Sequence, residues 1–225
     1  HACRVSDSAL GELLDELFEV YGRNEWAGEV LRARDEFVER TGQIFEDDEF
    51  YEARMTAFLE WYMIERTATK THCSPVIDAL RFETRAERKD VLRAWATSHR
   101  SVFEVRELDE GKVVLLDLVS GCEFRVDERR QVHGVSEGDV LEARLVGYRG
   151  EVLFGGAFLY HPQGTADAIR KQAQRIMGKG GTRTDVVDHV AALRVRVNRY
   201  RHVAVQQIYS GDASGTNDPP DRAPE

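Results

Sequence analysis

The chain lacks the residues that the most recognisable protein chemistries need. It has three cysteines, Cys3, Cys73 and Cys122, an odd number with wide spacing and no C-x-x-C pair. This pattern argues against a disulfide framework, a structural zinc site and a dithiol redox motif. The histidines form no H-E-x-x-H pattern, and no G-x-S-x-G nucleophile elbow is present. The sequence therefore predicts neither a metal nor a cofactor.

Long apolar runs are also missing. No stretch approaches the roughly 18–20 apolar residues of a membrane span, and no basic segment followed by an apolar one opens the sequence. We therefore expect a cytoplasmic protein with no membrane contact. Lysine is scarce as well, since 26 of the 31 basic residues are arginine. This bias indicates a GC-rich genome and hence a bacterial source.

What the chain does contain predicts an α+β protein with a helical bundle over residues 1–100. Apolar residues at helical spacing indicate the helices. They run from Ser6 or Ser8 to Tyr21, from about Glu25 to Arg40, from about Asp47 to Arg66, from Pro75, and from Thr84 toward Trp95. Residues 84–87 have the form of a capping box. The helix at 47–66 is apolar over most of its circumference, so we expect it at the centre of the bundle.

After Arg100 the apolar period changes from 3.6 to 2 residues, which predicts strands. The predicted strands are Val102–Leu108, Val113–Leu118, Glu123–Val126, Leu141–Tyr148 and Val152–Tyr160. Five short strands with little room for crossovers predict an antiparallel meander closed into a small β-barrel over residues 101–162.

Two further helices are expected over residues 163–210, packed back on the body. The first is predicted to be capped by Thr165. The second carries a regular apolar seam, formed by Val186, Val190, Leu193, Val197 and Tyr200. Residues 211–225 are rich in Gly, Ser, Asp and Pro, which predicts a disordered tail.

The segment from residue 45 to 160 resembles a known family. The motifs that carry the likeness are Glu60-Trp61-Tyr62, Arg66, Ser74-Pro75, Trp95, Val102-Phe103-Glu104-Val105, residues 117–126 and residues 138–144. Together they resemble the helical-plus-small-β-barrel body of uncharacterised bacterial proteins that often carry a SEC-C zinc-binding motif. The resemblance implies the fold. It implies no zinc, because this chain lacks the closely spaced cysteines of that motif.

Glu60, Glu65 and Arg66 are the polar candidates on the central helix. By helical angle Arg66 falls near the apolar face, so we expect it to be buried and paired with a carboxylate. Such a pair usually specifies packing. An enzyme of unknown type, with Glu60 and Arg66 in a pocket between bundle and barrel, is the third of three functional hypotheses.

Charge is unevenly distributed along the chain, whose net charge is −9. Residues 1–70 hold 17 acidic and 8 basic residues, whereas residues 163–210 hold 3 acidic and 9 basic residues. We expect salt bridges between the arginine-rich last helix and the acidic N-terminal region. The acidic run 46–49 is expected to begin the third helix, where negative charge suits the helix dipole.

The basic end supplies the binding candidates, which are Lys171, Arg175, Lys179, Arg183, Arg196 and Arg199. The leading hypothesis is a non-enzymatic protein-interaction or adaptor module that uses these helices or the exposed edge of the barrel. The second is nucleic-acid, nucleotide or phosphate binding through the barrel and the same helices, which the negative net charge disfavours. The segment 178–184 is not a P-loop, although Lys179, Arg183 and free amides there offer an anion site.

Overall fold

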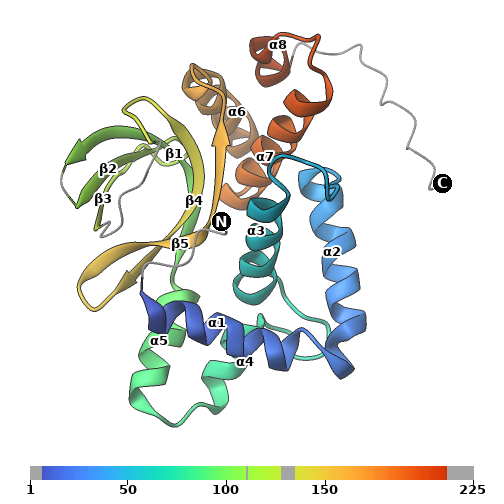
Figure 1. Ribbon diagram of the computed structural model, residues 1–225, viewed down its shortest axis with the longest axis vertical. Coiled ribbons are helices and arrows are strands. Elements are labelled where there is room, and N and C mark those ends of the chain that lie inside the picture. The colour runs from blue at the N-terminus through green and yellow to red at the C-terminus, as the bar shows by residue number, and fades with distance from the viewer. Residues whose placement is uncertain (1–6, 110, 128–134, 212–225) are drawn as a thin grey trace.

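The computed structural model describes residues 7–109, 111–127 and 135–211, which form eight α-helices and five β-strands (Figure 1). The predicted α+β class is therefore confirmed. Apart from Gly211, the predicted tail lies outside the described residues. No helix among the described residues has the length and apolar character needed to cross a membrane.

The N-terminal helices surround a central one. Their bounds are α1 Ser8–Tyr21, a 3₁₀ turn η1 Asn24–Trp26, α2 Ala27–Thr41, α3 Tyr51–Ile64, α4 Pro75–Phe82 and α5 Ala86–Ala96. As predicted, α3 is central: it lies between α2 and the sheet (Figure 1) and buries residues on all sides. Two hydrogen bonds join neighbouring helices, from Tyr62 Oη to the Tyr21 carbonyl (2.8 Å) and from Trp95 Nε1 to the Leu10 carbonyl (3.1 Å).

Several predicted helix starts are wrong, because nearby carboxylates form different local hydrogen bonds. Asp7, not a serine, caps α1 by accepting from the Ala9 amide. The predicted capping box at 84–87 does not form, since the Glu83 carboxylate accepts the amides of Thr84 and Arg85 instead. The acidic run 46–49 precedes α3 as a turn, in which Asp48 accepts the Phe45 amide.

The five strands form one antiparallel sheet with the order β3-β2-β1-β4-β5. Their bounds are β1 His99–Asp109, β2 Lys112–Asp117, β3 Glu123–Asp127, β4 Val140–Tyr148 and β5 Glu151–His161. Each predicted strand overlaps one of these. The sheet curls strongly (Figure 1), and the Val152 amide of β5 donates to Asp127 at the end of β3 (3.1 Å).

The predicted closure of this sheet into a barrel is not confirmed. The hydrogen-bonded order ends at β3 and at β5, and no ladder joins these two edges in the described residues. The concave side nevertheless holds its own apolar cluster, which includes Phe103, Leu115, Leu141 and Phe154. The result is a curled open sheet with a filled interior.

The C-terminal helices are α6 Ala166–Gly178, α7 Arg183–Arg199 and a short α8 Val205–Ser210, which the sequence did not predict. The predicted seam of α7 is confirmed: Val186, Val190 and Leu193 are buried, and Val197 and Tyr200 are partly buried. Thr165 stands at the N-cap of α6, but its hydroxyl donates to the Pro162 carbonyl and does not cap the helix. Because α7 packs against β1 and α2, it joins the sheet to the N-terminal helices (Figure 1).

Candidate functional site

Glu60 of α3 inserts its carboxylate into an irregularity of β5. The β4–β5 register shifts between Ala143 and Leu145. This shift frees the amides of Gly156 and Ala157, which donate to Glu60 Oε1 at 2.6 and 3.2 Å. A β-bulge of this kind re-aims backbone groups away from the ladder. The strand thus offers two N–H donors to one buried carboxylate.

Arg144 of β4 links this carboxylate to a second one. Its Nε donates to Glu60 Oε2 at 3.2 Å, its Nη2 donates to Glu65, and its Nη1 donates to Ser98 Oγ at 3.1 Å. Burial raises the pKa of Glu60, and Arg144 and the two amides oppose this effect. Burial acts in the same direction on Glu65, but Arg144 and Arg100 outweigh it and hold the pKa of Glu65 below its usual range.

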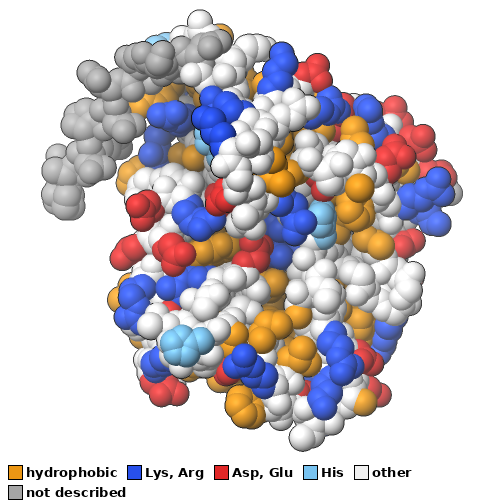
Figure 2. Space-filling view, turned by 180° about the vertical axis from the view of Figure 1, so that it is seen from behind, with side chains coloured by type: hydrophobic (Ala, Val, Ile, Leu, Met, Phe, Trp, Pro, Cys, Tyr) orange, Lys and Arg blue, Asp and Glu red, His pale blue; other side chains and the backbone are white. Residues whose placement is uncertain are grey.

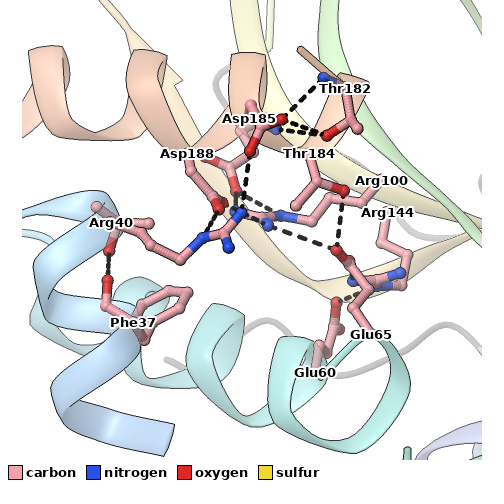
Figure 3. Close-up of polar contacts among 12 residues, drawn as sticks. Phe37, Arg40, Glu60, Glu65, Arg100, Arg144, Thr182, Thr184, Asp185 and Asp188 are labelled. Atoms are coloured by element: carbon pink, nitrogen blue, oxygen red, sulfur yellow. Dashed lines mark hydrogen bonds and ion pairs between the residues drawn. The ribbon is translucent and has the colours of Figure 1, made fainter. Parts of the chain in front are cut away.

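Arg100 of β1 continues the network toward α7 (Figure 3). Its Nε and Nη2 donate to Glu142 Oε1 at 2.9 and 2.7 Å, and its Nη1 donates to Asp188 Oδ1 at 2.9 Å. The other Asp188 oxygen accepts from Arg40 Nε of α2 at 2.6 Å. Because Arg100 Nη1 also lies 3.9 Å from Glu65 Oε2, a continuous chain of ion pairs joins α2, α3, α7 and the convex face of the sheet.

The polarity of these contacts between the chain ends is the reverse of the prediction. The sequence predicted that basic α7 side chains meet acidic N-terminal ones. Instead Arg40 from the acidic region pairs with Asp185 and Asp188 from the basic region. The two ends do dock together, but through a basic residue of the acidic region and two acidic residues of the basic region. Most acidic residues of the N-terminal region and most basic residues of the C-terminal region therefore face solvent.

The network leaves little room for chemistry. The cavity beside Glu60, Arg100 and Glu142 has a volume of ≈ 10 Å³, about enough for one water molecule. A water there would suit Glu142 Oε2, which is buried without a partner among the described residues. Each arginine is matched by carboxylates that it already contacts. The arrangement is therefore that of an ionic connection between the helices and the sheet.

Arg66 belongs to a different cluster from Glu60. It is buried and paired, as predicted, but its partners are Glu29 (2.5 Å) and Glu36 (2.7 Å) of α2. Glu29 also accepts the Thr69 amide. Since Glu60 and Arg66 contact separate sets of residues, the contacts among the described residues do not bring together the pair on which the enzyme hypothesis was built.

All six predicted basic binding residues are exposed on α6, α7 and the loop between them, and the side chains of five of them form no hydrogen bond or ion pair with the described residues. We call this set the basic face: Lys171, Arg175, Lys179, Arg183 and Arg196. The α6 members and the residue after that helix follow at intervals of four, which places them along one side. Burial together with the charges of Arg175 and Arg196 lowers the pKa of His189. Both arginines thus lie near one α7 side chain, although they come from different helices.

Within the described residues, no ion pair neutralises the charge of the basic face. None of its five side chains forms an ion pair in the described parts of the chain, whereas the acidic residues of α6 and α7 are all engaged. Asp167 pairs with Arg170, while Asp185 and Asp188 pair with Arg40 and Arg100. Figure 2 shows Lys and Arg side chains gathered at the upper end of the molecule, where these helices lie.

Arg199, the sixth predicted binding residue, is placed elsewhere. Its Nη2 donates to the Gln43 carbonyl at 2.5 Å, and its guanidinium lies 4.9 Å from the centre of the Phe45 ring. It fastens the end of α7 to the loop after α2. We therefore leave it out of the basic face.

The anion site suggested for residues 178–184 is largely used internally. Thr182 and Asp185 form a capping box at the start of α7, in which each side chain accepts the other residue's amide. Lys179 and Arg183 remain exposed, but two of the amides that would hold an anion already have partners. We therefore treat Lys179 and Arg183 as part of the basic face and not as a separate anion site.

Sequence reasoning missed the buried charges on the sheet. Glu142 and Arg144 fell within the predicted strand 141–148 without being singled out, and Arg100 lay before the first predicted strand. The two-residue alternation of β4 places Glu142 and Arg144 on one face, and the pairing of Arg100 with Arg144 places Arg100 beside them. That alternation, in strands otherwise rich in apolar residues, was the available signal.

The chain was compared with known families, curated proteins and solved structures. A protein-family model described as a family of unknown function (DUF7986) matches residues 12–199. No curated protein and no solved structure matches the chain.

Proposed function

We propose that this chain, which belongs to the DUF7986 family of unknown function, is a non-enzymatic interaction module that binds an acidic surface of another protein. The basic face on α6 and α7 would make the contact. The observation that carries this proposal is a set of five exposed cations that form no ion pair with any residue the structure describes, on helices whose own acidic residues are already paired.

Electrostatics favours such a surface as a docking site. Like charges held together on a rigid helix pair raise the local potential, and an acidic partner is attracted and oriented by it. Met177, which is 44% exposed on another side of α6, is an apolar residue available for contact on the same helix. Methionine is enriched at protein interfaces and adapts to varied partners.

Nucleic-acid binding is the second candidate, and the row of Lys171, Arg175 and Lys179 is the feature that favours it. Side chains at intervals of four on a helix can follow the phosphates of a single strand. The net charge of −9 argues against it, because a polyanion that extends beyond a small basic face meets repulsion from the rest of the molecule. We therefore favour a protein partner.

The remaining expectations are part of this proposal. The cytoplasm is a suitable compartment because Cys73 and Cys122 are free thiols. The relationship to the body of SEC-C-associated proteins stays a proposal, which rests on the motifs quoted above and on the order of elements from α3 to β5. Neither point bears on the identity of the partner.

The experiment is affinity capture from a nuclease-treated extract of the source organism. The test variant replaces Lys171, Arg175, Lys179 and Arg183 with Ala. We expect the wild type to retain a discrete protein that the variant loses by tenfold or more. Retention of RNA on the wild type before nuclease treatment, with no protein afterwards, would support the second candidate instead.

A matched control removes the same amount of charge from other faces. It replaces four exposed basic residues that form no ion pair in the described structure, namely Arg34, Arg81, Lys112 and Arg125, with Ala. This control should retain the partner. Equal loss in both variants would mean that net charge, and not the basic face, determines binding.

A further inference from the structure

A second surface, independent of the basic face, is a groove between α5 and the end of β4, at the end of the molecule opposite α6 (Figure 1). Its volume is ≈ 350 Å³, within the range of roughly 300–1,000 Å³ that is typical of ligand sites. Residues of α5 and Thr97 line one side, and Gly147, Tyr148 and Arg149 line the other. The groove therefore lies between a helix and the edge of a strand.

The end of β4 has a neighbouring strand on one side only. Its pairing with β1 stops at His99 and Leu145, because the chain before His99 turns away into α5. Its pairing with β5 continues to Tyr148 and Glu151. Among the described residues, positions 146–148 thus have no strand on the side that β1 has left, and this edge borders the groove.

Gly147 points its backbone N–H and C=O toward that free edge. Val152, which lies opposite Gly147 in β5, donates its amide to Asp127 of β3 (3.1 Å). Gly147 and Val152 are therefore a non-hydrogen-bonded pair, in which the backbone groups point away from each other. The β1 side agrees, since the Val105 amide donates to the Asp139 carbonyl (2.9 Å) and the two-residue period places Gly147 on the same side as Asp139.

The space beside Gly147 is open to another main chain. No backbone hydrogen bond of this residue outside the strand ladders is found in the described parts of the chain. A Cβ built on Gly147 would meet nothing within 4 Å. Glycine inside a strand often marks a place where another backbone approaches closely.

The charges of the groove favour a neutral ligand. Its lining holds two acidic residues, Glu87 and Asp90, and two basic residues, Arg93 and Arg149. Arg93 already pairs with Asp90 at 3.1 Å. Because these charges balance, the groove has no excess positive charge with which to attract a phosphate or a nucleic acid.

We propose that this groove binds a short, extended, uncharged segment of another protein, which pairs with Gly147 as an added strand. One residue of the segment donates to the Gly147 carbonyl and accepts from the Gly147 amide. It takes the place that β1 would fill if it continued two residues beyond His99. In such strand addition the main-chain hydrogen bonds supply affinity, and alternate side chains contact the groove walls, here α5.

Hydrogen exchange of the free full-length chain, measured by NMR, tests the first step. The amides of Val146 and Tyr148 face β5 and should be protected. The Gly147 amide should exchange at least about tenfold faster, because it lacks a partner. A Gly147 amide as protected as its two neighbours would overturn the proposal, since the edge would then already be occupied.

A phage-displayed library of random linear heptapeptides, selected on the full chain, tests the second step. We expect an enriched peptide to slow exchange of the Gly147 amide by at least about tenfold. Gly147→Pro removes the amide donor without removing a bond to β5, and Thr97→Trp fills the groove from an exposed position. Each should weaken binding of the peptide, measured by fluorescence polarisation, by tenfold or more.

The matched control is Gln174→Trp, which adds the same side chain at an exposed position of α6. It should bind the peptide as the wild type does. Thr97→Trp keeps the test decisive if proline at position 147 disturbs the fold. A selection that enriches no peptide would overturn the proposal, and so would enriched peptides that bind wild type and Thr97→Trp equally.

Discussion

Glu60 Oε1 lies 2.6 Å from the backbone nitrogen of Gly156. This contact joins the central helix of the N-terminal bundle to an edge strand that is 96 residues away along the chain. With the bonds from Ala157 and Arg144, it makes the Glu60 carboxylate the acceptor at the centre of the junction between helices and sheet.

Replacement of Glu60 by Ala should destabilise the fold strongly. The variant leaves the Arg144 guanidinium and two backbone amides buried with fewer partners, and breaking a buried pair in this way costs about 3–5 kcal/mol. Urea unfolding at neutral pH measures the loss. Exposed Glu107 provides the control, and its replacement by Ala should change stability by less than about 0.5 kcal/mol. A loss of under about 1 kcal/mol for Glu60→Ala would contradict the structural role.

Gly155 should tolerate no side chain. A Cβ at this position would lie 2.9 Å from Glu60 Oε1 and 3.2 Å from the Arg144 Cβ. Overpacking of this kind typically costs about 1–3 kcal/mol, and we expect Gly155→Ala to lose that much stability in urea unfolding. Gly147 is the matched control in the neighbouring strand, because a Cβ there meets nothing within 4 Å. If both variants were equally stable, the close approach of Glu60 to β5 would be wrong.

Asp117 should make the fold sensitive to acid. Burial alone would raise its pKa, but hydrogen bonds from His99, Ser101, the Val119 amide and Ser120 outweigh burial and lower the pKa to about 2. A carboxylate with a lowered pKa stabilises the fold above its unfolded-state pKa of about 4. That stabilisation, about 2 kcal/mol, is lost as the pH falls through the folded-state value.

Guanidinium unfolding between pH 6 and pH 2.5 measures this effect. Asp117→Asn should be less stable than the wild type at pH 6, and the difference should shrink as the pH falls. Part of the acid sensitivity should persist in the variant, because hydrogen bonds from Arg66, the Thr69 amide and Arg32 outweigh burial and also lower the pKa of Glu29 to about 2. A stability difference that stays constant down to pH 2.5 would contradict the assignment.

The charge-removing variant of the basic face should fold normally. Lys171, Arg175, Lys179 and Arg183 are exposed and unpaired in the described structure, and substitutions at such positions usually change stability by less than about 0.5 kcal/mol each. Circular dichroism and thermal unfolding should match the wild type within a few degrees. A large fall in Tm would mean that these residues support the fold, and loss of binding in the variant would then say nothing about an interface.

Much of the fold could be predicted because its local patterns are strong. Alternating apolar residues indicated each strand, and the seam of α7 followed directly from spacing. Helix starts were harder, since a carboxylate one or two residues away can replace the expected cap, as Glu83 does before α5. Barrel closure depends on the distance between β3 and β5, which no local pattern encodes.

The candidate sites, too, could be predicted only where they depend on local pattern. Exposure of the basic residues was foreseeable because they lie off the apolar faces of α6 and α7. The network of ion pairs was not, because its paired members are 35 to 148 residues apart and meet only when the sheet packs against α3 and α7. Arg199 was misplaced for a related reason, since the loop that it contacts lies more than 150 residues away in sequence.

Site-specific photocrosslinking in living cells tests directly whether the basic face binds a protein partner. A photoreactive amino acid is placed at Gln174, an exposed α6 position between Lys171 and Lys179, and at the exposed Arg125 of β3 as a reference. We predict a discrete, nuclease-resistant protein adduct from position 174 that is absent from position 125 and is lost when the four basic residues are replaced by Ala. No adduct at 174, or the same adduct at both positions, would contradict the proposal that the basic face binds an acidic protein partner.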